Sequence, residues 1–256
     1  MKKILFFDVD GTLYNLNKQL PSSAKKAIAQ AKENGYEIAI ATGRAPFMID
    51  EILDELDIDT YVTFNGQYVV YKGEVIFTDG VSKQQLSDII EFGSERKHPV
   101  VFLDAEQMIA SEPNHDFIQE SMNALRYPYP VINPTFYEKN ILYQTLVFME
   151  EKDDALYKET FPDVNFVRWH RYSCDILPKE GSKARGIQML LNKMNIPISN
   201  AIAFGDGLND IEMLKAVGTG VAMGNGHDRV KEIADVVADH VDRDGLAKVM
   251  KDLKII

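Results

Sequence analysis

Two aspartates one residue apart end the first apolar run of the chain, ILFFDVDGTL at residues 4–13. Carboxylates this close repel each other, so the pattern predicts a positive charge beside them. One carboxylate can attack phosphorus and form an aspartyl-phosphate, while a second gives a proton to the leaving alcohol and later takes one from water. Asp8 suits the first role because it ends a rigid strand, and Asp10 suits the second. The spacing favours phosphoryl transfer.

Further polar residues follow the other apolar runs that we expect to form parallel strands. They are Thr42, Gly43 and Arg44 after the second strand, Asn65 and Gly66 after the third, and Gly205, Asp206, Asn209 and Asp210 after a late one. Lys183 stands at the expected start of a helix, after PKEGSK. Ligands bind at the carboxyl ends of parallel strands, because loops and helix amino termini meet there. We therefore expect these side chains to share one pocket.

A pocket with four carboxylates needs a cation. Oxygen ligands without a histidine pair or a thiolate favour Mg²⁺, which takes one or two carboxylates together with a phosphate. Lys183, Thr42 and the backbone N–H groups of the turn at residues 10–12 would then face the remaining phosphate oxygens. The expected cofactor is Mg²⁺.

The elements that must position these residues alternate between strands and helices in the first eighty residues, which predicts an α/β fold. We expect strands at 3–7, 36–42 and 61–66, and helices at 21–35 and 46–56, followed by a β-hairpin at 68–77. The same rhythm returns after Gly181. The predicted core is a Rossmann-like, doubly wound parallel sheet.

The middle of the chain has a different pattern. From about Ser82 it reads as a helix, a strand, a further helix, a proline-rich loop (YPYPVINP) and strands at 141–149 and 167–177. This stretch predicts a separate α+β insertion. The expected domains are therefore a core of residues 1–81 and 181–256 and an inserted α/β cap of residues 82–180.

Four segments together resemble the sequence motifs of the haloacid dehalogenase (HAD) superfamily of phosphatases. They are DVDGT at 8–12, ATGR at 41–44, PKEGSK at 178–183 and GDGLND at 205–210, in the family's order. The long insertion, NG at 65–66 and AMGNG at 222–226 most resemble the Cof-type branch, which carries an α/β cap. The resemblance implies a Mg²⁺-dependent phosphatase that hydrolyses small phosphorylated metabolites, such as sugar phosphates.

The resemblance also implies roles for single residues. Asp8 would be the nucleophile, Asp10 the acid and base, and Asp206 a metal ligand along with Asp8 and the Asp10 carbonyl. Asp210 would support the metal through water. The phosphate would be held by Thr42, Gly43, Lys183 and Asn209. Further candidate substrate contacts do not come from the resemblance. Asn65 and Gly66 end the third strand, and Arg44 would either contact substrate or pair with a surface carboxylate. Arg168, His170 and Arg171 in the insertion are candidates because their side chains are planar and cationic.

Composition limits the partners. The 28 Lys and Arg against 39 Asp and Glu give a formal charge of −11, which argues against a nucleic-acid or anionic-membrane partner bound by bulk charge. The single cysteine, Cys174, fits a reducing compartment, and no apolar run reaches the length of a membrane span. We expect a cytoplasmic protein that binds a small phosphorylated substrate, with no obligate protein partner evident.

Two other functions use the same residue types. A phosphosugar mutase would pass the phosphoryl group from Asp8 to a sugar instead of water. A non-enzymatic phospho-receiver or phospholigand-binding protein would also gather Asp, Thr and Lys around Mg²⁺ in a parallel sheet. Asp10 beside Asp8 argues against a receiver, because it offers a base for rapid hydrolysis of the phosphorylated aspartate.

Overall fold

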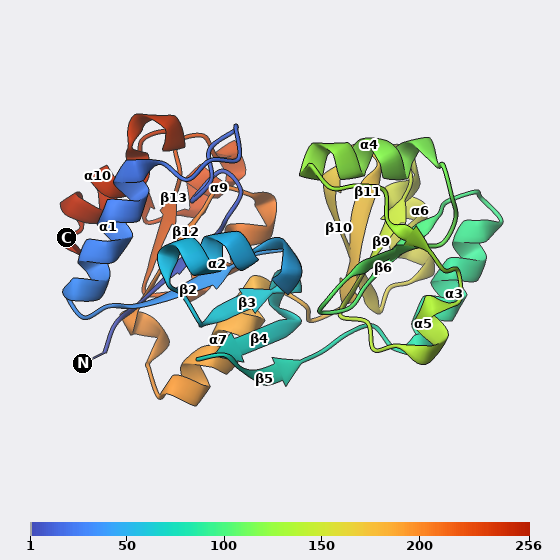
Figure 1. Cartoon of the computed structure of the whole chain (residues 1–256), viewed down its shortest axis with the longest axis horizontal. Coiled ribbons are helices and arrows are strands. Elements are labelled where there is room, and N and C mark those ends of the chain that lie inside the picture. Colours follow the sequence, from blue (N-terminus) through green and yellow to red (C-terminus); the bar gives the residue numbers. More distant parts are fainter. Residues whose placement is uncertain (1) are drawn as a thin grey trace. The chain divides into compact units, whose positions relative to one another are not determined.

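The computed structural model describes residues 2–256 and divides the chain into two compact units (Figure 1). Unit 1 comprises Met1–Arg44, Met48–Phe77 and Ser182–Ile256, and unit 2 comprises Ala45–Phe47 and Thr78–Gly181. The chain thus leaves unit 1 near residue 77 and returns near residue 182. These bounds lie within a few residues of the expected 81 and 181.

Unit 1 is built on an eight-stranded sheet with the order β14-β13-β12-β1-β2-β3-β4-β5. The strands are β1 (Ile4–Phe7), β2 (Glu37–Ala41), β3 (Tyr61–Thr63), β4 (Tyr68–Tyr71), β5 (Glu74–Thr78), β12 (Ala201–Gly205), β13 (Thr219–Ala222) and β14 (Val236–Val237). The pairs from β14 to β3 are parallel, and β4 runs antiparallel to β3. The chain thus winds outward in both directions from β1, as a doubly wound fold does.

Helices cover both faces of this sheet. The central strand β1 is apolar at every position, so it has side chains to bury on each face. Its side chains alternate between the two faces. Leu5 and Phe7 pack in the core formed with α1 (Ser22–Glu33), α2 (Asp50–Leu56) and α10 (Gly245–Asp252). Ile4 and Phe6 pack in a second core on the opposite face. That core includes side chains of α7 (Lys183–Met194), α8 (Ile211–Ala216) and α9 (Asp228–Ile233). Short 3-10 turns complete the unit at Phe64–Gly66, Ile198–Asn200, Leu208–Asp210 and Val241–Arg243. A further 3-10 turn, Pro46–Met48, has Pro46 and Phe47 in unit 2 and Met48 in unit 1.

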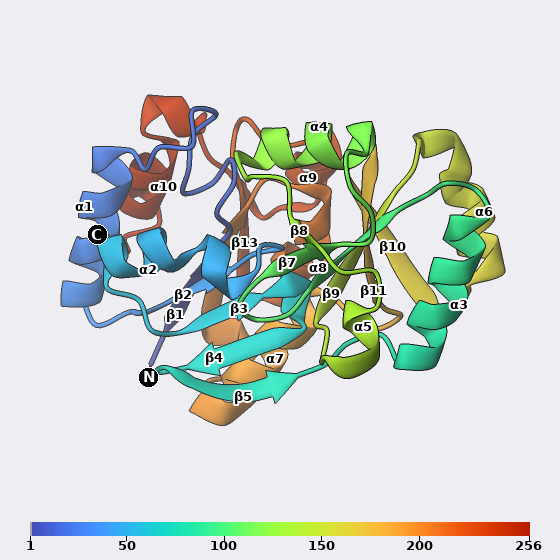
Figure 2. The same ribbon diagram turned by 45° about the vertical axis from the view of Figure 1, so that its right-hand side comes forward.

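Unit 2 contains a six-stranded sheet with the order β10-β11-β9-β6-β7-β8, in which only β7 and β8 are a parallel pair among the described strands (Figure 2). Its strands are β6 (Val100–Leu103), β7 (Met108–Ala110), β8 (Val131–Ile132), β9 (Gln144–Phe148), β10 (Val164–His170) and β11 (Ser173–Pro178). Its helices are α3 (Lys83–Ser94), α4 (Asp116–Leu125), α5 (Phe136–Lys139) and α6 (Asp154–Thr160), with a 3-10 turn at Glu151–Asp153. Side chains of α3 and α6 pack against one face, around the fully buried Tyr157.

Three expected elements are wrong in detail. The expected strand at 61–66 ends at Thr63, and residues 64–66 form a 3-10 turn in which Asn65 has a φ of 52°. The expected helix at 46–56 is a 3-10 turn followed by the shorter α2, because Ile49 departs from helical backbone angles (φ −122°, ψ 2°). The expected strand at 167–177 is two antiparallel strands, β10 and β11, joined by a turn at Arg171 and Tyr172. That turn contains no glycine, proline or asparagine, so the sequence carried no signal for it.

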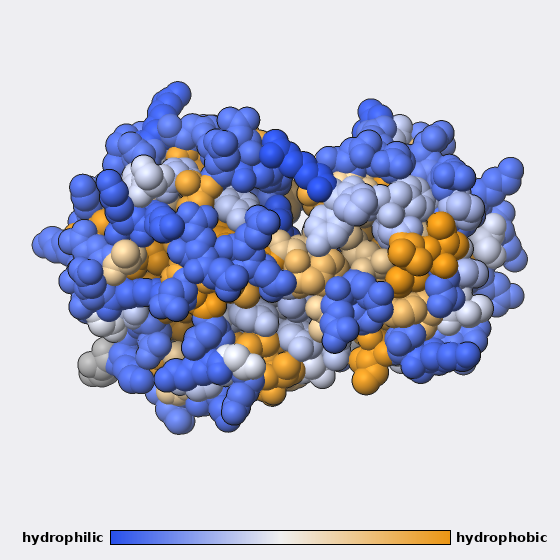
Figure 3. All heavy atoms as spheres, in the orientation of Figure 1, coloured by the Kyte–Doolittle hydropathy of each residue, from blue (hydrophilic) through white to orange (hydrophobic). Residues whose placement is uncertain are grey.

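Among the described residues, no helix is both long and apolar enough to cross a bilayer. Most of the face drawn in Figure 3 is hydrophilic. Unit 2 nevertheless exposes several large apolar side chains, including Val131, Ile132 and Ile141.

Candidate active site

The predicted catalytic residues lie where the direction of strand order reverses. β1 is flanked by β12 on one side and β2 on the other, and both neighbours are parallel to it. Asp8 and Asp10 follow the carboxyl end of β1, and Asp206 and Asp210 follow that of β12. A crevice at such a switch point is the usual ligand site of an open α/β sheet.

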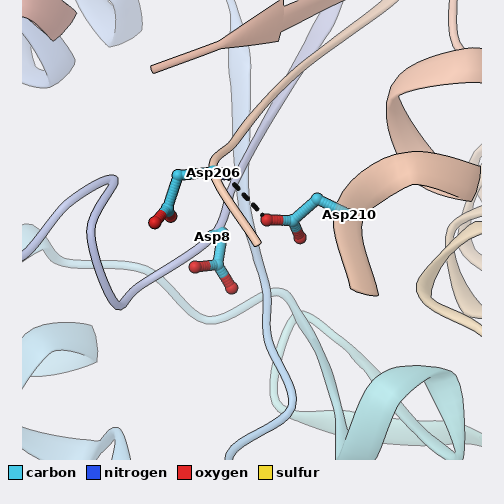
Figure 4. A group of neighbouring side chains, drawn as sticks. All are labelled: Asp8, Asp206 and Asp210. Carbon is cyan, nitrogen blue, oxygen red and sulfur yellow. Dashed lines mark hydrogen bonds between the residues drawn. The ribbon is translucent and has the colours of Figure 1, made fainter. Parts of the chain in front are cut away.

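Three carboxylates form a compact acidic group at this switch point (Figure 4). One oxygen from each of Asp8, Asp206 and Asp210 lies within 4.8 Å of the others. The ammonium group of Lys183, whose side chain is fully buried, lies 2.6 Å from Asp8 Oδ1 and 2.6 Å from Asp210 Oδ1. Lys183 is therefore the positive charge beside Asp8.

Local backbone structure fixes the Asp206–Asp210 turn. Asp210 Oδ2 accepts hydrogen bonds from the backbone N–H groups of Asp206 (2.9 Å) and Gly207 (2.8 Å), the first of which is drawn in Figure 4. Thr12 Oγ1 donates to Asp206 Oδ1 at 3.0 Å. Gly205 allows the close approach, because a Cβ there would lie 2.6 Å from the Asp210 carboxyl carbon. The acidic group is thus preorganised by the chain itself.

The electrostatics of the group indicate an excess of negative charge. Burial raises the pKa of Asp8 well above its ordinary range; Lys183 opposes this shift, and Asp210 and Asp206 add to it. Burial and then Asp210 raise the pKa of Asp206 to about 7. The pKa of Lys183 is raised although burial opposes this, because Asp210 and Asp8 both favour its charged form. Lys183 offsets one of three negative charges, which leaves two for a divalent cation to offset.

The donor set fits a metal ion. Carboxylate oxygens are hard ligands of the kind that divalent cations such as Mg²⁺ and Mn²⁺ prefer. Two carboxylate oxygens within 4.8 Å of each other repel by about 3 kcal/mol or more at an effective dielectric constant near 20. Asp8, Asp206 and Asp210 could therefore hold a metal ion, and the ion would relieve their repulsion.

Asp10 belongs to a separate ion-pair cluster. Arg44 donates hydrogen bonds to both carboxylate oxygens of Asp10, from Nε to Oδ2 at 2.7 Å and from Nη2 to Oδ1 at 2.8 Å. Lys18 Nζ also pairs with Oδ1. Burial alone would raise the pKa of Asp10, but Arg44 and Lys18 outweigh burial and lower it below its ordinary value. The Asp10 side chain is therefore not a member of the acidic group. Only its carbonyl remains a candidate metal ligand.

The residues predicted to bind phosphate or substrate at the ends of β2 and β3 lie together. Asn209 Nδ2 donates to Asn65 Oδ1 at 3.0 Å, and a Cβ on Gly43 would lie 3.0 Å from the same oxygen. Thr42 is buried, and its Oγ1 accepts from the backbone N–H of Arg44 at 3.1 Å. The structure thus brings Thr42, Gly43, Asn65 and Asn209 side by side.

Gly66 explains the close packing of this loop on α7. Its φ of +97° lies in the left-handed region, and a Cβ there would lie 2.0 Å from the carbonyl oxygen of Ser182. Ser182 caps α7, because its side chain accepts a hydrogen bond from the backbone N–H of Arg185. The next residue is Lys183, so Gly66 contributes to placing that lysine rather than presenting a side chain.

The three candidates in unit 2 already have partners within that unit. Arg168 forms a two-nitrogen ion pair with Asp154, and its Nη1 donates to three carbonyl oxygens, including those of His170 and Arg171 (both 2.9 Å). These bonds use the guanidinium for structure, which argues against Arg168 as a substrate contact.

His170 and Arg171 contact helix α4. His170 Nδ1 lies 2.9 Å from Ser121 Oγ, and Arg171 Nη2 lies 2.6 Å from Glu120 Oε2. Both contacts hold α4 beside the turn between β10 and β11. Their substrate role stays a prediction.

Three residues of the site were not among the predicted ones. Thr12 contacts Asp206, Lys18 contacts Asp10, and Asn225 Nδ2 donates to the Gly11 carbonyl oxygen at 2.7 Å. Thr12 and Asn225 stand inside the recognised segments DVDGT and AMGNG, so those motifs could have pointed to them. Lys18 is one lysine in a loop, and nothing in the sequence marks it.

Comparisons with known proteins agree with this geometry. A family model described as haloacid dehalogenase-like hydrolase matches residues 5–250. The Bacillus subtilis (strain 168) protein named "Putative phosphatase YkrA" is 40% identical over 254 residues, which cover 99% of this chain and 98% of that protein.

Two solved structures are also similar over the full length of both chains. A hypothetical protein from Geobacillus kaustophilus HTA426 has a TM-score of 0.93 at 46% identity. The HAD subclass IIB sugar phosphatase BT4131 has a TM-score of 0.90 at 31% identity. The predicted family and the Rossmann-like core with an inserted α/β cap are confirmed. The chain is a phosphatase that belongs to the haloacid dehalogenase-like hydrolase family, in its Cof-type branch.

Proposed function

We propose that the protein is a Mg²⁺-dependent phosphomonoester hydrolase that works through an aspartyl-phosphate on Asp8. One observation carries the proposal. The buried Lys183 pairs with Asp8 and Asp210 within a three-carboxylate group whose remaining negative charge calls for a divalent cation. When bound, Mg²⁺ would offset charge on the carboxylates and on the phosphoryl oxygens.

The two carboxylates after β1 would divide the chemistry. An Asp8 oxygen would form a bond to phosphorus as the bond between phosphorus and the ester oxygen breaks. Arg44 and Lys18 lower the pKa of Asp10 in the free protein, but the negative charge of a bound phosphate would favour the protonated form. Asp10 would then give this proton to the ester oxygen, so the alcohol leaves neutral. In the second step Asp10 would take a proton from water as the water oxygen attacks phosphorus and the bond to Asp8 breaks. Inorganic phosphate is released, and both carboxylates return to their starting states.

The remaining groups would hold the phosphoryl group during both steps. Lys183 is fixed by two carboxylates, so its charge is in place before the substrate arrives. Thr42, Gly43 and Asn209 would supply donors to the other oxygens. Positioned charges of this kind supply most of the rate gain in phosphoryl transfer, because the protein does little other covalent chemistry.

The proposed substrates are small phosphorylated metabolites of the cytoplasm, with sugar phosphates as the leading class. The similar structure BT4131 is described as a sugar phosphatase, which supports this class. We propose Mg²⁺ rather than a softer metal because the acidic group offers carboxylate oxygens and no nitrogen or sulfur ligand within the described residues.

The test compares phosphate release from p-nitrophenyl phosphate by the native chain, by Asp8→Asn and by Asp88→Asn. Asp88 is a matched control, because it is an exposed helical aspartate in unit 2. We expect turnover that requires Mg²⁺ in the native chain and in Asp88→Asn, and its loss in Asp8→Asn. Equal rates in all three would overturn the proposal. Transfer of phosphate to an added sugar rather than to water would instead favour a mutase.

A further inference from the structure

Lys18 makes an ion pair with Asp10 that the family motifs do not include. The residue lies in the loop between β1 and α1, eight positions after Asp10. Its side chain is 28% exposed, so most of it is shielded from water. A lysine that contributes only to solubility would extend into water, whereas Lys18 extends toward the Asp10 carboxylate.

The loop is built to aim this lysine. Lys18 has a φ of +57°, in the left-handed region, which costs a non-glycine residue about 1–2 kcal/mol. Asn15 holds the strained turn, because its Oδ1 accepts from the backbone N–H groups of Asn17 (2.9 Å) and Gln19 (3.1 Å). The backbone N–H of Lys18 donates to the carbonyl oxygen of Asn15 at 2.9 Å. Strain that the surroundings maintain is a reason to look for function.

The contacts divide the two oxygens of Asp10 unequally. Oδ1 accepts from both Arg44 Nη2 and Lys18 Nζ, whereas Oδ2 accepts from Arg44 Nε alone. A carboxylate oxygen has two lone pairs. Oδ1 has therefore used both, and Oδ2 keeps one for proton transfer.

Arg44 is held in place by contacts of its own, so we do not attribute the difference between Oδ1 and Oδ2 to a movement of its side chain. Its Nη1 donates to the Met48 carbonyl oxygen at 3.2 Å, and its guanidinium carbon lies 5.8 Å from the centre of the Tyr14 ring. Arg44 alone donates one hydrogen bond to each of the two oxygens. Lys18 is the contact that distinguishes them.

We propose that Lys18 is a positioning residue for Asp10, which fixes Oδ1 so that Oδ2 handles the proton of the leaving group and then of water. Lys18 does not touch the reacting atoms. This inference rests on the proposed role of Asp10 as acid and base.

The test uses two leaving groups that differ in their need for an acid. Nitrophenolate leaves readily without a proton, whereas the alkoxide of an alkyl ester such as glycerol 3-phosphate needs one. Because general acid–base catalysis contributes about 10²–10⁴-fold, loosening the acid costs the alkyl substrate most. We expect Lys18→Met to lower kcat for glycerol 3-phosphate about tenfold or more, to lower kcat for p-nitrophenyl phosphate less than about threefold, and to leave KM for both unchanged.

Controls separate this role from general damage. Lys18→Arg should restore most of the lost rate, since it keeps a donor for Oδ1. Lys25→Met removes a lysine from an exposed ion pair with Glu55 (3.0 Å) and should change neither rate. Retained turnover of p-nitrophenyl phosphate by Lys18→Met shows that the site is folded. An equal loss on both substrates, or no loss on either, would overturn the inference.

Asp10→Asn in the same assay distinguishes the role of Lys18 from the role of Asp10. If it slows the alkyl ester far more than the aryl ester and Lys18→Met does not, only the role of Lys18 is wrong. If Asp10→Asn shows no such preference, Asp10 is not the acid, and both the proposed mechanism and the role of Lys18 fail.

Discussion

Gly11, in the motif DVDGT, lies directly against the carboxylate of Asp206 in the acidic group. Its φ is +79°, and an added Cβ would lie 2.1 Å from Asp206 Oδ2. Real Cβ atoms essentially never come within 3.0 Å of such a neighbour, so Gly11→Ala requires a shift of about 0.9 Å. The glycine is tied on both sides, by its N–H to the Tyr14 carbonyl (2.8 Å) and by its carbonyl to Asn225 (2.7 Å). The Asp206 carboxylate must therefore be the group that moves.

The expected cost has two separable parts. The positive φ alone costs about 1–2 kcal/mol of stability for alanine. The displacement of Asp206 is expected to lower kcat/KM about a hundredfold, because a 1 Å misplacement in an active site has effects of that order. Moving Asp206 also stretches its hydrogen bond from Thr12, so the Mg²⁺ concentration needed for half-maximal activity should rise.

Gly35→Ala is the matched control for this prediction. Gly35 has a φ of +85°, and an added Cβ would have nothing within 4 Å. We expect Gly35→Ala to lose about as much stability as the positive φ costs in Gly11→Ala. We also expect it to keep native activity. Urea denaturation and Mg²⁺ titration of p-nitrophenyl phosphate turnover measure both parts. Native activity in Gly11→Ala, or an equal loss of activity in Gly35→Ala, would show that the contact between Gly11 and Asp206 does not place the carboxylate.

Three further predictions follow from buried groups. Lys183→Met should lower the free energy of unfolding by about 3–5 kcal/mol in EDTA, because it leaves two carboxylates without their shared cation; urea denaturation measures this, and Mg²⁺ should restore part of the loss. Burial raises the pKa of Cys174 to about 12, so the native protein should not react with a thiol reagent at pH 8 until it unfolds; rapid labelling would contradict this. Burial lowers the pKa of His98 below its ordinary 6.5, so its neutral form stabilises the fold above about pH 6.5 and that contribution is lost as the pH falls. His98→Gln should therefore reduce the fall in Tm between pH 7 and pH 5, and an unchanged fall would count against it.

The sequence predicted which residues gather at the carboxyl ends of the unit 1 strands, because this arrangement follows from simple rules. The apolar run before Asp8 could only be a buried strand, and parallel strands bring their carboxyl ends to one edge. Asp206 and Asp210 follow a second such run. Lys183 could be placed because it stands at the expected start of a helix, and in the structure its ammonium group contacts Asp8.

Other features depended on information that the sequence pattern lacks. The contact of Lys18 depends on one left-handed residue in a loop, which no periodicity indicates. Arg168 was predicted to face a substrate because it is planar and charged, but the strand pairing places it opposite Cys174, where Asp154 of α6 binds it. The face of a sheet on which a side chain lies depends on the register of its strand. The register of this strand could not be predicted, because the turn at Arg171 was not recognised in the sequence.

In the proposed mechanism Asp8 carries the phosphoryl group between the two steps. The most direct measurement is rapid acid quenching of the native enzyme during turnover of p-nitrophenyl phosphate with Mg²⁺, followed by mass spectrometry of the peptide that contains Asp8. We expect a fraction of this peptide to gain one phosphoryl group on Asp8, and we expect this group to be absent from Asp8→Asn. Efficient turnover with no phosphoryl group on Asp8, together with native rates in Asp8→Asn, would contradict the proposed mechanism.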